Sequence, residues 1–110
     1  MLIAARASDG FTIFDITGDI DLAHSPQMRK ALLGEIKEKK IPKVFLNMKN
    51  VRYIDSSGIA SLVEGLKASR DVGTRLILFG LNNSVREVMQ LSRLQKIFEI
   101  FDDEAQALAS

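Results

Sequence analysis

Two short, uninterrupted apolar runs constrain the fold of this chain most strongly. They are Val-Phe-Leu at residues 44–46 and Leu-Ile-Leu-Phe at residues 76–79, and both have the length of a strand. Continuous apolar strands are typical of parallel sheets that are buried on both faces. Between the two runs, residues 57–72 carry apolar side chains at helical spacing, namely Ile59, Leu62, Val63 and Leu66. The pattern therefore predicts two parallel strands joined by a helix.

The remaining segments extend this unit in both directions. Asp9-Gly10 is a strong turn signal and predicts a hairpin at the start of the chain. The elements predicted outside the central unit are strands at residues 2–7, 11–17 and within 95–101, a loop at residues 18–21, and helices that begin at Ser25-Pro26, at Asn83 or Ser84, and at Asp102-Asp103. We therefore predict one α/β domain over residues 1–110, of order β-β-α-β-α-β-α-β-α. Its sheet is mixed and mostly parallel, and about four helices cover it.

The composition excludes several kinds of function. Fifteen basic and fourteen acidic residues create no general field that would attract nucleic acid or an anionic membrane. The basic run at residues 37–40 is typical of a solvated helix end. The chain has no cysteine, which excludes disulfides and thiolate metal sites. No apolar run approaches the roughly 18 residues that a membrane span needs. We predict a cytoplasmic protein with no direct nucleic-acid binding and no membrane insertion.

The segment Asp55-Ser56-Ser57-Gly58 stands at the predicted start of the second helix. The first N–H groups of a helix lack intrahelical partners, and Asp and Ser are favoured capping residues. Capping of the helix can explain the presence of Asp and Ser here, but a single residue is enough to cap a helix. A phosphoryl group on a hydroxyl at this position would suit the helix dipole. It would also place about −1.5 to −2 charges beside Asp55 and disfavour an acidic or closely packed partner. The sequence leaves both interpretations open.

The same helix contains an unusual number of small residues, which are Ala60, Ser61, Gly65, Ala68 and Ser69. A glycine inside a helix costs about 1 kcal/mol relative to alanine, so Gly65 needs a reason. One interpretation is an outer surface that another protein's backbone can approach closely. The other is that Gly65 relieves crowding against a neighbouring helix of the same domain.

Catalysis and metal binding are weaker interpretations of these residues. An enzyme would use Ser56 as nucleophile, His24 as base and Asp21 to orient it, but Asp-Ser-Ser-Gly lacks the glycine-flanked serine of a nucleophile elbow. The carboxylates of Asp19, Asp21 and Asp55 suit Mg²⁺, but no full ligand set is visible. The chain contains no glycine-rich loop followed by lysine, so no nucleotide site is predicted. We therefore expect neither an enzyme nor a bound cofactor.

Residues 54–60, Ile-Asp-Ser-Ser-Gly-Ile-Ala, resemble the signature of the STAS domain of bacterial anti-sigma factor antagonists. The similarity extends over nearly the whole chain. It includes the Gly-acidic-hydrophobic-Asp pattern at residues 17–21 and the segments at residues 45–48, 73–76, 84–89 and 97–98. Arg93 departs from the pattern, because many members carry glycine before the last strand.

The resemblance implies a phosphorylation-controlled exchange of partners. An anti-sigma factor with kinase activity would bind the unphosphorylated chain, release its sigma factor and phosphorylate Ser56, with Ser57 as the reserve acceptor. A phosphatase would reset the cycle, and the kinase would carry the ATP and magnesium. The residues that the resemblance and the small-residue pattern assign to partner binding are Asp19, Asp21, Asp55, Ser57, Gly58, Ala60 and Ser61. STAS domains also serve in phospholipid ABC transporters and in sensory or stress assemblies, so that alternative stays open, as does self-association.

Overall fold

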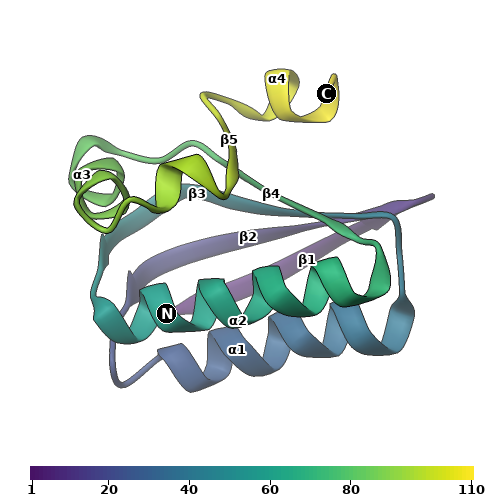
Figure 1. The fold of residues 1–110 in the computed structure, drawn as a ribbon, viewed down its shortest axis with the longest axis horizontal. Helices are drawn as coiled ribbons and strands as arrows, with labels where there is room; N and C mark the ends of the chain where they lie inside the picture. The colour runs from purple at the N-terminus through teal and green to yellow at the C-terminus, as the bar shows by residue number, and fades with distance from the viewer.

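The computed structural model describes residues 1–110 and contains one five-stranded sheet of order β1-β2-β3-β4-β5 (Figure 1). The strands are β1 (Leu2–Ser8), β2 (Phe11–Ile20), β3 (Lys43–Ile54), β4 (Arg75–Phe79) and β5 (Glu99–Phe101). The β1–β2 hairpin is antiparallel, and every other neighbouring pair is parallel. The predicted element order and mixed sheet are confirmed. None of the helices combines the length and hydropathy that crossing a membrane requires.

The helices cover the two faces of the sheet unequally. On one face, α1 (Ser25–Gly34) and α2 (Ser56–Val72) lie side by side, and a π-helical turn, Glu35–Lys39, prolongs α1 (Figure 1). The short helix α4 (Glu104–Leu108) lies on the opposite face. The helix α3 (Asn83–Leu91) and a 3-10 turn, Leu94–Lys96, connect β4 to β5.

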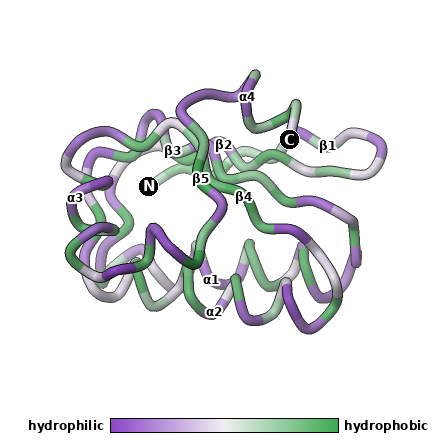
Figure 2. Tube along the Cα trace, turned by 45° about the horizontal axis from the view of Figure 1, so that its top comes forward, coloured by the Kyte–Doolittle hydropathy of each residue, from purple (hydrophilic) through white to green (hydrophobic).

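The core has two parts, one on each face of the sheet. Successive side chains of a strand point to opposite faces, so Leu46 belongs to the larger cluster under α1 and α2, and Phe45 to the smaller cluster near α4. Figure 2 shows the hydrophobic central strands between helices whose polar and apolar residues alternate. Burial on both faces explains the continuous apolar runs, as predicted for parallel strands.

The predicted loop at residues 18–21 is wrong for residues 18–20, because β2 continues to Ile20. Its partner β3 likewise runs beyond the apolar run at residues 44–46 to Ile54. The two extensions pair in parallel register, Gly18 with Val51 and Ile20 with Ile54, so their backbone groups find partners in the sheet. The register shifts between Gly18 and Asp19, and Gly18 has a φ of 104° that few other residues adopt. The extension brings the ends of β2 and β3 together.

Two predicted caps also differ from the structure. Ser25 is the first residue of α1 and is buried, while His24 occupies the N-cap position. The backbone oxygen of Asp21 accepts the N–H groups of His24 and Ser25 at 3.1 and 2.7 Å, and no side chain makes a capping hydrogen bond at the start of α1. The cap of α3 is Asn82, one residue before the predicted position; its side chain accepts from the N–H of Val85. The final helix begins next to the predicted Asp102-Asp103, and Asp103 is its cap.

The small residues of α2 mostly face the inside of the domain. Ser61, Gly65, Ala68 and Ser69 are buried, and only Ala60 is exposed. A Cβ on Gly65 would lie 2.2 Å from Cδ2 of Leu32 in α1. The second interpretation of Gly65 is therefore confirmed: glycine lets the two helices approach each other.

We expect Gly65→Ala to lower the free energy of unfolding by about 2 kcal/mol, because the added methyl overlaps a fully buried leucine. Gly34→Ala is the matched control, since Gly34 is also helical and a Cβ there meets nothing within 4 Å. That substitution should raise the free energy of unfolding by about 0.5–1 kcal/mol. Urea denaturation measures both, and stabilisation by Gly65→Ala would contradict the packing described.

Arg93 adopts a left-handed conformation with a φ of 58°, at the position where many STAS domains carry glycine. Left-handed backbone costs a non-glycine residue about 1 kcal/mol. Arg93→Gly should therefore raise the thermal midpoint of unfolding, whereas Arg93→Ala should not. Equal midpoints for the glycine and alanine variants would show that the backbone conformation carries no such cost.

Candidate functional site

The candidate site lies where β3 passes into α2, beside the loop between β2 and α1. Asp55 has an extended backbone and caps α2. Its Oδ1 accepts hydrogen bonds from the N–H groups of Ser57 at 2.9 Å and Gly58 at 3.0 Å. Its Oδ2 accepts from the N–H of Leu22 at 3.0 Å, and its own N–H donates to the carbonyl of Ile20. Asp55 therefore holds the start of α2 against the end of β2.

Ser56 is the first residue of α2 and is exposed. It contributes nothing to the cap, because the Asp55 carboxylate accepts both capping hydrogen bonds. Ser57 is half-buried, and its carbonyl accepts a hydrogen bond from the Ser61 hydroxyl at 3.2 Å. Of the two hydroxyls, Ser56 is the one that another protein reaches without disturbing the helix.

The three predicted acidic residues make separate contacts. Asp19 pairs with Arg52 at 3.4 Å, and the Asp55 carboxylate accepts backbone hydrogen bonds. Asp21 accepts a hydrogen bond from Nδ1 of His24 at 2.7 Å. Desolvation by itself would raise the pKa of Asp21, but the hydrogen bonds from His24 hold that pKa below its usual value. Asp21 is therefore ionised at neutral pH.

These contacts weigh against the two chemical alternatives. No group of three or more His, Asp or Glu side chains is arranged to hold a metal ion, so Asp19, Asp21 and Asp55 do not converge. The predicted His24–Asp21 pair does form, but it lies at the start of α1, and no hydrogen bond joins His24 to Ser56. The geometry thus lacks the contact between base and nucleophile that a catalytic serine uses.

Two of the small residues near Ser56 are buried and contact neighbouring elements. Gly58 is buried, and a Cβ there would lie 2.3 Å from the carbonyl oxygen of Ile20. The buried Ser61 donates to the carbonyl of Ser25 in α1 at 3.2 Å. Ala60 is exposed, one turn after Ser56. A shallow hollow of about 420 Å³ lies between the first turns of the two helices, lined by Ser25, Pro26, Arg29, Ser57, Ala60, Ser61 and Glu64.

Sequence reasoning missed Leu22. It is 74% exposed and lies in the loop that the Asp55 carboxylate holds. The available signal was a large apolar side chain between Asp21 and the predicted helix start at Ser25, where neither a strand nor a helix is predicted.

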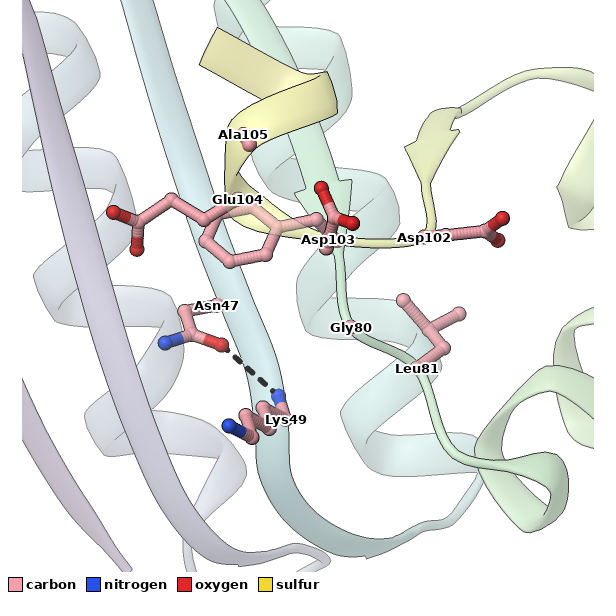
Figure 3. Close-up of a pocket in the computed structure, with 9 residues that line it drawn as sticks. Asn47, Lys49, Gly80, Leu81, Asp102, Asp103, Glu104 and Ala105 are labelled. Atoms are coloured by element: carbon pink, nitrogen blue, oxygen red, sulfur yellow. Dashed lines mark hydrogen bonds between the residues drawn. The ribbon is translucent and has the colours of Figure 1, made fainter.

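A second hollow, of about 510 Å³, lies at the end of β4 beside α4 (Figure 3). In Figure 3, Asp102, Asp103 and Glu104 border it on one side, with Asn47 and Lys49 on the other. Its acidic groups have structural partners: Asp103 caps α4, and Glu104 pairs with Arg6 at 2.7 Å. None of the residues predicted for the site lines this hollow, so the candidate site remains the surface around Ser56.

Substituting neighbouring residues should separate the structural role from the functional one. Asp55→Ala removes the acceptor of three backbone hydrogen bonds, so we expect the free energy of unfolding to fall by about 2 kcal/mol. Ser56→Ala should change it by no more than about 0.5 kcal/mol, because its side chain is exposed. Urea denaturation of both variants is the measurement. A loss in Ser56→Ala as large as in Asp55→Ala would make the serine structural.

Comparison with known proteins identifies the family. The profile described as STAS domain matches residues 3–107. An anti-sigma-B factor antagonist of Listeria monocytogenes is 31% identical over 99 residues, covering 89% of this chain and 84% of the relative. An anti-sigma F factor antagonist of Paenibacillus polymyxa is 27% identical, covering 90% and 85%. A putative anti-sigma factor antagonist from Thermotoga maritima shares the fold with a TM-score of 0.91 at 24% identity, covering 97% of this chain and 92% of that one. The resemblance predicted from residues 54–60 is confirmed, and the chain belongs to the STAS domain family.

Proposed function

We propose that this chain is an anti-sigma factor antagonist whose binding is switched at Ser56. In its unphosphorylated form it binds an anti-sigma factor that has serine kinase activity, and the sigma factor is released. The observation that carries the proposal is the exposed Ser56 hydroxyl next to a helix cap that Asp55 alone supplies. The relatives described as antagonists of anti-sigma factors support it.

The physical basis of the switch is charge added to a surface that already carries carboxylates. Phosphorylation of Ser56 adds about −1.5 to −2 charges beside Asp55 and near Asp21. One added unit charge facing a like charge at about 6 Å, with an effective dielectric constant of about 20, costs roughly 3 kcal/mol. That is about a hundredfold in affinity, which is enough to release a partner.

The fold tolerates the same charge. The cap of α2 depends on hydrogen bonds to the Asp55 carboxylate, and Ser56 takes no part in them. A phosphate at the first residue of a helix also lies at the positive end of the dipole. Phosphorylation would therefore change the surface while the domain stays folded.

The proposal assigns the other residues and partners as follows. Asp19, Asp21, Asp55, Ser57 and Ala60 form the partner-binding surface, while the buried Gly58 and Ser61 shape it from beneath. A phosphatase restores Ser56, and Ser57 is the reserve acceptor. The kinase supplies ATP and magnesium. The chain acts in the cytoplasm, and residues 1–110 form one STAS domain. It is a binding protein that needs no cofactor and is not an enzyme.

A pull-down from the native cell extract tests the switch. Wild type and Ser56→Ala should both retain an ATPase with the fold of a histidine kinase, whereas Ser56→Asp should lose it because of the added charge. Incubation of the retained kinase with wild type and ATP should place phosphate on Ser56, as located by peptide mass spectrometry.

Other results would overturn the proposal. Phosphate found on Ser57 alone would move the switch by one residue. Recovery of only a transporter ATPase, bound equally by wild type and Ser56→Asp, would favour the phospholipid-transport alternative.

A further inference from the structure

Leu22 is a large apolar side chain that the fold holds in solvent. It is 74% exposed, in the short loop between β2 and α1. Such a position could be mobile, but the N–H of Leu22 donates to Oδ2 of Asp55 at 3.0 Å. The preceding residue, Asp21, is also fixed, since its backbone oxygen accepts two N–H groups at the start of α1. The position of Leu22 is therefore set by two helix starts.

The same carboxylate fixes Leu22 relative to Ser56. One oxygen of Asp55 caps the helix that Ser56 begins, and the other accepts from Leu22. The hydroxyl and the leucine thus belong to one rigid surface. An interface residue that is already held in place loses little conformational freedom on binding, and this favours affinity.

The neighbouring surface leaves room for a partner to enclose this side chain. Ala60 lies one turn after Ser56 on the exposed side of α2 and adds only a methyl group. The hollow between α1 and α2 begins beside it, and the ion pair of Arg29 with Glu64 borders that hollow. A projecting leucine on a surface with little bulk at Ala60 fits a partner with an apolar pocket.

We propose that Leu22 anchors the anti-sigma factor kinase by entering an apolar pocket on the surface of the kinase. This inference rests on the proposed function and assigns separate roles within it. Leu22 sets how tightly the kinase binds, and Ser56 sets whether it stays bound. Burial of an anchored apolar side chain at the centre of an interface contributes much of the binding energy there.

The test compares Leu22→Ser with Val72→Ser, using the purified kinase that wild type retains and Ser56→Asp loses. Val72 is also an exposed apolar residue, but it lies sixteen residues along α2 from Ser56, about 24 Å at the rise of a helix. Isothermal titration calorimetry should show at least a tenfold higher Kd for Leu22→Ser and less than a twofold change for Val72→Ser. In the kinase reaction, Leu22→Ser should raise KM by a similar factor and leave kcat unchanged. Leu22→Met should restore the affinity.

The outcomes separate the anchor from the switch. Wild-type affinity of Leu22→Ser, with binding still lost in Ser56→Asp, overturns the anchor and leaves the switch intact. A lower kcat at unchanged KM also overturns it, because Leu22 would then act by positioning Ser56. If no kinase is retained, or if it binds Ser56→Asp as it binds wild type, the proposed function fails and the anchor fails with it. Thermal midpoints equal to wild type are expected for the Leu22 variants, because the side chain is exposed.

Discussion

The carboxylate of Asp55 accepts hydrogen bonds from three backbone N–H groups, and the geometry of the candidate site depends on them. Two come from the first turn of α2 and one from the loop before α1. The ends of two strands and the beginnings of two helices are thereby held in one arrangement. An alanine at this position would leave those N–H groups without their acceptor. The surface that carries Ser56 is therefore as rigid as the helix start itself.

This arrangement explains why one capping residue is followed by two hydroxyl residues. Asp55 meets the capping requirement of α2, so Ser56 is free of any structural duty. A residue that makes no stabilising contact can be phosphorylated and dephosphorylated with little change in the stability of the fold. If Ser56 had been the cap, phosphorylation would have replaced the acceptor on which the helix start depends. In the proposed switch, stability and regulation would therefore reside on different, adjacent side chains.

The predictions from sequence succeeded where the signal is local and failed where it depends on a distant partner. The apolar runs at residues 44–46 and 76–79 indicate by their composition that both faces are buried, so the parallel strands could be predicted. The extensions of β2 to Ile20 and of β3 to Ile54 carry polar residues and a register shift, and only their mutual pairing makes them strands. Gly65 was ambiguous because the side chain that requires it, Leu32, lies 33 positions earlier. The role of Leu22 was hidden for the same reason, since its acceptor is Asp55.

The sheet topology also determines which groups meet at the site. Because β2 and β3 are parallel, their carboxyl ends lie at the same edge of the sheet, and the helices that follow both begin there. The positive ends of the α1 and α2 dipoles therefore point to one surface. The carboxylates of Asp21 and Asp55 lie at those two helix starts, where hydrogen bonds from the first backbone N–H groups reach them. A further negative charge on Ser56 would be favoured by the dipoles of both helices, which offset part of its repulsion by Asp55 and Asp21. The place of Ser56 at this surface thus follows from the parallel pairing of two strands as much as from the local sequence.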